Sequence, residues 1–249
     1  WMLVGFVHGV MNTDNMALGG ETIDYGPCAF IDAYDPAAVF SSIDRDGRYA
    51  FGNQPSMAHW NLARLAEALL PILHENEDRA LELAKEALAV FPGRFHEFWL
   101  DGMRRKLGLF TAEADDPALI DDLLVLLLAS RADYTNSFRD LTRDPLPDEP
   151  LFRHPNFQDW HEHWTARRSR QNASLEDSRR LMLASNPSVI PRNHRVEEAL
   201  AAAVEHGDQS VMDRLLKVLT RPFDDSPEHT AFQNPPPPDA SPYVTYCGT

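Results

Sequence analysis

An amide and a carboxylate flank a pair of glycines near the start of the chain. Asn15 and Asp24 lie nine residues apart, and Gly19-Gly20 stands midway between them. Two adjacent glycines can supply both positive-φ residues of a two-residue β-hairpin turn. Such a turn would place Met16 opposite Ile23 and, in the same register, Asn15 opposite Asp24.

The predicted register would let one metal ion bind both side chains. Directly opposed residues of an antiparallel pair have Cβ atoms about 4.5–5.5 Å apart. The oxygens of Asn15 and Asp24 could then share a hard cation such as Mg²⁺, which completes its shell with water and phosphate oxygens. We therefore predict a metal site at Asn15 and Asp24, with a nucleotide phosphate held beside Asp24.

The same residues have the spacing of a protein-kinase catalytic loop. Asn15 follows His8 by seven residues, and Asp24-Tyr25-Gly26 resembles the Asp-Phe-Gly triplet that binds the second metal in kinases. A kinase would carry its catalytic Asp two residues after the histidine, where this chain has Val10. Val10 therefore argues against a conventional kinase.

The full motif resembles one family, selenoprotein O (SelO, also called YdiU). The resemblance rests on the string His8–Asn15 followed by Thr22–Pro27, and it extends along the whole chain. Further similar segments are Phe51–Pro55, Trp60–Leu62, Asn186-Pro187, Pro191–Asn193 and Tyr246–Thr249.

The resemblance implies a protein adenylyltransferase, which moves AMP from ATP to Ser, Thr or Tyr hydroxyls of proteins. It implies Mg²⁺ or Mn²⁺ at Asn15 and Asp24, with UTP as a possible alternative to ATP. By the same resemblance Asp14 acts as the base or orienter for the incoming hydroxyl, although an acid that only holds its own loop is nearly as good an interpretation. His8 is expected to support the loop from inside.

Two other functions stay open. A conventional kinase would transfer the γ-phosphate, against which Val10 counts. A catalytically dead pseudokinase would serve as a scaffold, against which the intact pair of Asn15 and Asp24 counts.

The chain has two cysteines, Cys28 and Cys247. Two cysteines of an intracellular chain are usually unrelated thiols. The resemblance changes this expectation, because Cys28 follows the metal motif in the position of a kinase activation loop and Cys247 stands where some family members carry selenocysteine. It implies a Cys28–Cys247 disulfide that makes activity redox-sensitive.

Charge limits the possible partners. The net charge is −15, which argues against binding a nucleic-acid backbone or an anionic membrane. Within the first fifty residues only Arg45 and Arg48 oppose seven acids, so a triphosphate would need a metal ion and basic residues from elsewhere. No Gly-rich phosphate loop precedes His8.

The resemblance implies that an N-terminal lobe, absent from this chain, supplies those basic groups. We therefore expect the chain alone to be catalytically inert and its own N-terminal lobe to be a partner.

No apolar run reaches the roughly 18 residues that span a bilayer. A bacterial cytoplasm is favoured by family analogy, or a mitochondrion for a eukaryotic source.

The remaining pattern is helical. Apolar stripes and caps predict a mainly α fold with a small β-hairpin, similar to the larger lobe of kinases with a helical extension over residues 1–225. A basic patch that includes Arg167 is expected to be a solvated face. The predicted helices are Ser56–Leu73, ending or kinking at Pro71; a second from Asn76 that stops at Pro92-Gly93; Phe95–Leu107, burying Phe98; a leucine-rich helix opened by Asp115-Asp116-Pro117; and Tyr134–Leu141, Phe157–Arg170, Leu175–Ala184, Val196–His206 and Ser210–Leu219.

The C-terminal segment is rich in proline. Residues 226–249 are expected to form a proline-rich C-terminal tail, in which Asn234–Asp239 should be extended polyproline II. A tail of this composition is typical of a linker or of a strap across the surface.

Overall fold

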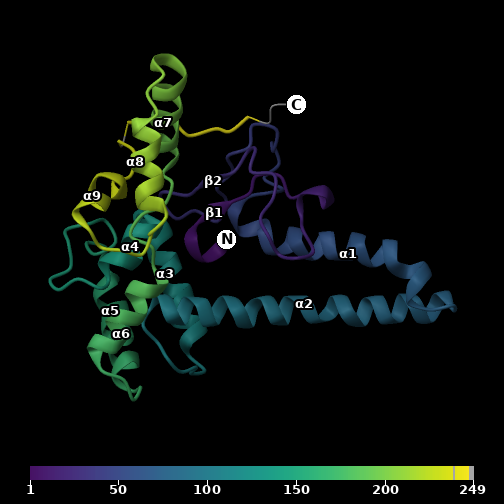
Figure 1. Ribbon diagram of the computed structural model, residues 1–249. Helices are drawn as coiled ribbons and strands as arrows, with labels where there is room; N and C mark the ends of the chain where they lie inside the picture. The colour runs from purple at the N-terminus through teal and green to yellow at the C-terminus, as the bar shows by residue number, and fades with distance from the viewer. Residues whose placement is uncertain (238, 247–249) are drawn as a thin grey trace.

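The computed structural model describes residues 1–237 and 239–246 and is mainly helical (Figure 1). Three 3₁₀ turns, at Met2–Val4, Thr13–Asn15 and Phe51–Asn53, and two short strands lie in or next to the first fifty residues. The strands are β1 (Phe6–Val7) and β2 (Ala29–Phe30). The helices are α1 (Gln54–Leu73), α2 (Glu77–Lys106), α3 (Asp116–Ser130), α4 (Tyr134–Asp140), α5 (Phe157–Ser169), α6 (Leu175–Ser185), α7 (Asn193–His206), α8 (Ser210–Leu219) and α9 (Pro227–Gln233).

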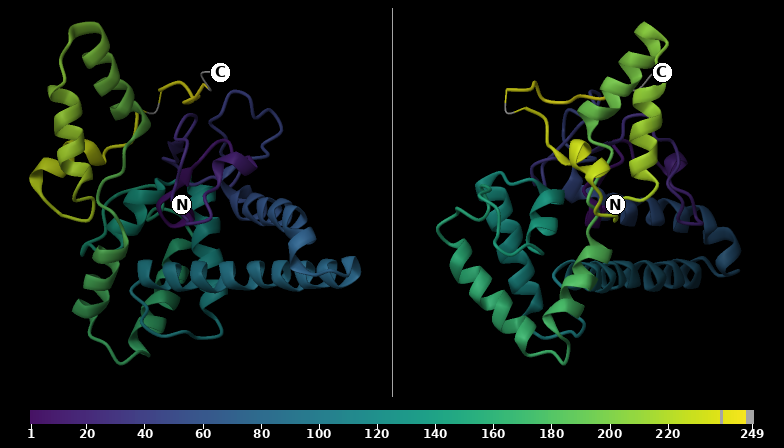
Figure 2. Two further views of the ribbon diagram at one scale, coloured as in Figure 1. Left: turned by 45° about the vertical axis from the view of Figure 1, so that its right-hand side comes forward. Right: turned by 60° about the vertical axis from the view of Figure 1, so that its left-hand side comes forward.

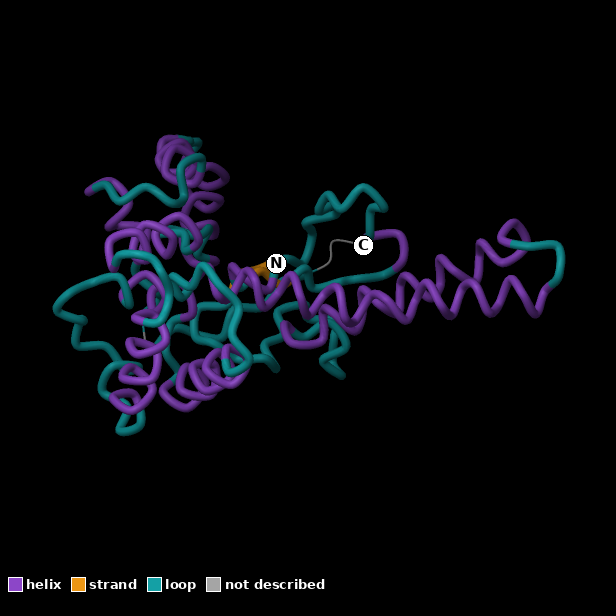
Figure 3. The backbone as a smooth tube through the Cα atoms, turned by 90° about the horizontal axis from the view of Figure 1, so that it is seen from below, coloured by secondary structure: helices purple, strands orange, loops and turns teal. Residues whose placement is uncertain are grey.

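The two longest helices, α1 and α2, form an antiparallel pair that projects from the body of the molecule (Figure 3). Asn76 caps α2 as predicted, since its side chain accepts a hydrogen bond from the Arg79 amide. The predicted stop at Pro92-Gly93 is wrong, because α2 runs through both residues to Lys106. An interior proline costs a helix about 3 kcal/mol, and packing of α2 against α1 and α6 offsets that cost.

Two further details of these helices differ from prediction. Helix α1 begins at Gln54, with Asn53 as its cap residue in place of Ser56, because Pro55 suits the first turn of a helix. Phe98 is 72% exposed, although it was expected to be buried. On the continuous helix Phe98 lines an apolar cavity with Phe95 and Trp99 instead of entering the core.

The core lies where α2, α3, α4 and α5 meet. Its largest fully buried side chains include Trp164, Tyr134, Phe138 and Met103. Helix α3 opens on Asp116 with Pro117 in its first turn, as predicted. Helix α6 begins with a capping box, in which Ser174 and Asp177 exchange hydrogen bonds at its N-terminus. Helices α4 to α8 lie within a few residues of their predicted bounds.

The predicted hairpin register is wrong by one residue. Met16 bridges Thr22 rather than Ile23, and residues 17–21 form the connection. A turn with two positive-φ residues does not form, because Gly20 has a φ of 86° and Gly19 does not have a positive φ. The Gly20 amide donates instead to the Ala17 carbonyl at 3.1 Å, which sets the longer turn.

The tail is only partly extended. Residues 227–233 form α9, which was not predicted, and His229 is buried against the Arg221 carbonyl. Beyond α9 the chain runs back across the molecule toward the loops of the first fifty residues (Figure 2). There Thr245 forms an isolated β-bridge with Ser41. Residues 241–246 thus form a strap across the surface, as predicted. Cys247 lies outside the described residues.

Within residues 1–237 and 239–246, none of the helices combines the length and apolarity that crossing a membrane requires.

Candidate functional site

The predicted site residues lie on one excursion of the chain. Strands β1 and β2 pair antiparallel, Phe6 with Phe30 and Val7 with Ala29, so the segment 8–28 leaves and returns at the same place. This segment carries Asp14, Asn15 and Asp24. The two-stranded sheet therefore does the positioning that the predicted hairpin was expected to do.

His8 joins the two halves of this excursion. Its side chain is fully buried, and its Nε2 lies 2.7 Å from the Ile23 carbonyl oxygen, next to Asp24. Its backbone amide donates to Gln54 Oε1 at 3.0 Å. The predicted role of His8 as an internal support fits these contacts, because one imidazole ties the loop to the segment before Asp24.

Gly9 allows the closest approach between the halves. Its φ is 86°, and a Cβ built on it would lie 2.5 Å from the Pro27 carbonyl oxygen. Any side chain would therefore force backbone apart, in addition to the strain of a left-handed conformation. The loop after β1 and the segment after Asp24 are in contact only because this residue is glycine.

Two polar residues of α1, Gln54 and Asn61, hold the loop through hydrogen bonds to its backbone. Gln54 accepts from the His8 amide and donates to the Phe6 carbonyl at 2.8 Å. Asn61 donates to the Met11 carbonyl at 2.9 Å. Both side chains are buried, so they hold the backbone on either side of His8 rather than reaching substrate.

The structure leaves the predicted ligands available to solvent. Asn15 is half-buried, and its Nδ2 donates to the Val10 carbonyl at 3.0 Å, which leaves Oδ1 as the atom able to bind a cation. Asp14 and Asp24 are exposed, and neither forms an ion pair with any described residue. Asp24 has a φ of 53°, a left-handed conformation that is uncommon outside glycine.

This donor set fits a divalent cation that keeps other ligands. Among the residues that the structure describes, no group of three or more His, Cys, Asp or Glu side chains could enclose a metal. One amide oxygen and one or two carboxylates instead suit Mg²⁺, which takes few protein ligands and binds substrate phosphates and water.

The segment after Asp24 is held by distant parts of the chain. Asn193 accepts from the Phe30 amide at 3.1 Å and donates to the Phe30 carbonyl at 2.9 Å, so it completes the free edge of β2. Its neighbour Arg192 is fully buried and pairs with Asp32 and Asp133, each at 2.6 Å. Burial disfavours the charge, but Asp133 and Asp32 outweigh it and raise the pKa of the Arg192 guanidinium. Arg192 and Asn193 therefore have a structural role, joining the segment after β2 to α4 and α7.

The strap reaches the same segment. Thr245 Oγ1 donates to the Pro27 carbonyl at 2.7 Å, and Tyr243 donates to Glu197 Oε1 at 2.8 Å. Cys28 is half-buried beside this contact, and burial raises the pKa of its thiol. The tail therefore lies next to Cys28, although the partner predicted for Cys28 is not among the described residues.

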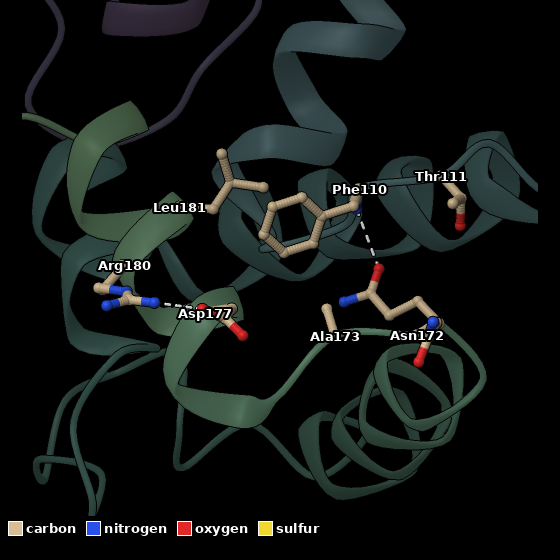
Figure 4. Close-up of a pocket in the computed structure, with 8 residues that line it drawn as sticks. Phe110, Thr111, Asn172, Ala173, Asp177, Arg180 and Leu181 are labelled. Atoms are coloured by element: carbon tan, nitrogen blue, oxygen red, sulfur yellow. Dashed lines mark hydrogen bonds and ion pairs between the residues drawn. The ribbon is translucent and has the colours of Figure 1, made fainter.

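Two cavities differ in their position relative to the loop 8–28. One, of about 610 Å³, lies between Phe110 and the start of α6, where an Arg180–Asp177 ion pair closes one side (Figure 4). It contains none of the predicted site residues. The other, of about 490 Å³, is apolar and borders the loop through Met11 and Met16.

The sequence did not predict the roles of Gln54, Asn61 or Tyr49. Tyr49 donates to Asn12 Oδ1 at 2.7 Å, so it steadies the loop from the side opposite Asn61. A buried polar residue inside an apolar helical stripe, as at Asn61, was the available signal. Its partner could not be named, because Asn61 and Met11 are fifty residues apart.

Comparison with known proteins covers the whole chain. The sequence profile described as "Protein adenylyltransferase SelO" matches residues 1–220. A "Protein nucleotidyltransferase YdiU" of Syntrophotalea carbinolica is 59% identical over all 249 residues, which span 51% of that protein. Proteins of the same name from Alkaliphilus metalliredigens and Halalkalibacterium halodurans are 57% and 58% identical over the same span. The chain thus covers about half the length of these relatives, and it belongs to the protein adenylyltransferase SelO family.

Proposed function

We propose that the full-length protein containing this chain transfers AMP from ATP to hydroxyl side chains of other proteins. The observation that carries the proposal is the single excursion 8–28, on which the Asn15 oxygen and the Asp14 and Asp24 carboxylates are left without protein partners among the described residues. Membership of the SelO family supports the same reaction.

In this proposal Asn15 Oδ1 and the Asp24 carboxylate hold Mg²⁺ or Mn²⁺. The bound cation neutralises phosphate charge, which acidic residues alone cannot do. Asp24 also lies beside the nucleotide phosphates. His8 and Gln54 keep both ligands in place through the Ile23 carbonyl and the backbone of β1, since positioning supplies much of the rate in such transfers.

Asp14 orients the substrate hydroxyl. The hydroxyl oxygen attacks the α-phosphorus, the bond to the bridging oxygen breaks, and pyrophosphate leaves; the hydroxyl proton passes to Asp14 or to water. Asp14 suits this role because it is exposed on the 3₁₀ turn Thr13–Asn15, next to the proposed metal ligand. UTP in place of ATP would use the same geometry.

The first fifty residues contain too few cations to hold a triphosphate. We propose that the remaining half of the protein, by family resemblance an N-terminal lobe, supplies them, and that the chain by itself is inert. The relatives named above are bacterial, and we propose the bacterial cytoplasm as the working compartment.

We also propose that Cys28 and Cys247 form a regulatory disulfide. Support comes from the contact of Thr245, two residues before Cys247, with Pro27, one residue before Cys28. The bond would fasten the strap to the segment that follows Asp24. Mass mapping of the oxidised and reduced full-length protein would detect this cross-link, and its absence after oxidation would dismiss it.

The proposed reaction is tested by the intact mass of the full-length protein and of a generic protein substrate after incubation with Mg²⁺ and ATP. An added AMP that disappears in Asp24→Ala supports AMP transfer and the metal role of Asp24. An added phosphate would instead identify a γ-phosphate kinase. No mass change together with no metal-dependent nucleotide binding would favour a scaffold.

A further inference from the structure

Two arginines gather around one exposed tryptophan at the start of α1. The guanidinium carbons of Arg48 and Arg64 lie 4.8 and 5.2 Å from the ring centroid of Trp60, which is 38% exposed. Arg48 also lies 5.8 Å from the ring of Tyr49. Contacts between a guanidinium and an aromatic face fix the plane of the cation at little cost in hydration.

The two arginines differ in what their N–H groups contact. Arg64 is paired with Glu67 at 2.6 Å on its own helix. The Arg48 guanidinium has no hydrogen-bond acceptor or carboxylate partner among the described residues. Asp44 is close in sequence, but its two oxygens accept from the amides of Arg48 and Tyr49, both at 2.8 Å. The guanidinium of Arg48 is thus held in orientation while its donors stay available.

This cluster is connected to the loop that carries Asp14. Tyr49, which follows Arg48, donates to Asn12, and Asn61, which follows Trp60, donates to the Met11 carbonyl. Met11 and Asn12 directly precede the turn Thr13–Asn15. The loop containing Arg48 lies over the start of α1, with the other loops of the first fifty residues around it (Figures 1 and 2).

We infer that Arg48, stacked on Trp60, is a docking point for an acidic side chain of the protein that receives AMP. The inference rests on the proposed function. A guanidinium offers a carboxylate two parallel hydrogen bonds. With a net charge of −15, most of this chain's surface repels an acidic segment, so an available, oriented arginine beside the proposed hydroxyl site selects where such a segment lies.

The test compares two peptides on the full-length protein. Both carry one serine, flanked by glutamates in one peptide and by glutamines in the other. We expect kcat/KM for AMP transfer to be about fivefold higher for the glutamate peptide, equivalent to about 1 kcal/mol, as for exposed charge pairs. In Arg48→Gln the ratio of kcat/KM for the glutamate peptide to kcat/KM for the glutamine peptide should fall to about one. Arg48→Lys keeps the charge without the planar fork, so its ratio should lie between those of Arg48→Gln and the unmodified protein.

Arg79→Gln is the control for the loss of one exposed arginine charge, because Arg79 is exposed like Arg48 but is already paired with Glu82 on α2. Its ratio should equal that of the unmodified protein. Equal rates for both peptides in the unmodified protein would overturn the inference and leave AMP transfer intact.

Two further outcomes would also overturn the inference. A raised KM for ATP in Arg48→Gln, with an unchanged peptide ratio, would show that Arg48 binds the nucleotide. Absence of AMP transfer to any protein or peptide would remove the proposed function itself, and the docking inference with it.

Discussion

At the scale of single residues, Asp116 shows how a buried charge is held. Its side chain is fully buried at the start of α3 and accepts from Arg104 Nε at 2.7 Å, Arg167 Nε at 2.6 Å and the Glu113 amide at 2.8 Å. Burial alone would raise the pKa of this carboxyl. The hydrogen bonds from Arg167, Glu113 and Arg104 outweigh burial and lower it.

Replacing Asp116 by asparagine should lower the free energy of unfolding by about 3 kcal/mol, because Arg104 loses its carboxylate partner and buried Arg167 keeps only Glu113. Urea denaturation measures the loss. Asp115→Asn is the control, since Asp115 is exposed and its side chain caps nothing. Equal losses in both variants would contradict the role given to Asp116.

Acid should reduce this contribution. A carboxyl whose pKa is lower in the folded state stabilises the fold above its unfolded pKa of about 3.9, and the contribution is lost as the pH falls toward the folded pKa. The difference in unfolding free energy between the unmodified protein and Asp116→Asn should therefore shrink below about pH 4. A difference that stays constant from pH 6 to pH 3 would refute the lowered pKa.

Arg167 shows what the sequence could not reveal at this scale. Its run of neighbouring arginines predicted a solvated basic face, yet Arg167 is buried and paired with Asp116. The two residues are 51 positions apart, so no local pattern connects them. Pairing across such a distance depends on how α3 and α5 pack.

At the scale of elements, the loop 8–28 depends on glycine in two different ways. Gly9 and Gly20 both have a φ of 86°, but only Gly9 faces a close backbone oxygen, while Gly20 has open space around the position of a Cβ. Substitutions at Gly9 and Gly20 therefore separate the free-energy cost of a left-handed conformation from the cost of a steric clash.

Gly20→Ala should cost about 1 kcal/mol, the ordinary penalty of a left-handed residue. Gly9→Ala should cost clearly more, because the Pro27 carbonyl must move, and it should also reduce AMP transfer by the full-length protein. Thermal unfolding and the transfer assay measure the two effects. If Gly9→Ala behaves like Gly20→Ala in both, the close approach of the two halves is unimportant.

Local signals predicted elements better than they predicted pairings. The Asn76 cap is a short-range signal and was predicted correctly, as were the approximate bounds of α4 to α8. The stop at Pro92 failed because tertiary packing overrode a local preference. The hairpin register failed because Gly19 does not adopt the positive φ that the motif permits.

At the scale of the whole molecule, the strap closes the fold. The Thr245 carbonyl accepts from the Ser42 amide at 2.9 Å, and the Thr245 amide donates to the Phe40 carbonyl at 2.8 Å. Residues near position 41 are thereby joined to the far end of the chain, beside Pro27.

Deleting residues 241–249 should expose the Ser42 amide and speed its hydrogen exchange, because its acceptor is removed. Hydrogen-exchange mass spectrometry of the full-length protein resolves this region. The peptide covering the N-terminal turns of α2 is the internal reference and should not change. Unchanged exchange near Ser42 would show that the strap does not protect it.

The three candidate site residues stay a prediction, and of the residues that support them the sequence predicted His8. Motif spacing pointed to Asn15 and Asp24, the family resemblance pointed to Asp14, and all three lie on the excursion 8–28. The residues that hold the excursion come from elsewhere: Gln54 from α1 and Asn193 from α7. Such supports are set by tertiary contacts, which one sequence does not display.

The bond between Asn193 and Phe30 also has a consequence for biosynthesis. These residues are 163 positions apart, and ribosomes add about 5–20 residues per second. Roughly 10–30 s therefore pass between the emergence of β2 and the arrival of the side chain that completes its edge. During that interval the edge of β2 lacks the side chain of Asn193, so the segment 8–28 gains its last support only after the start of α7 has been translated.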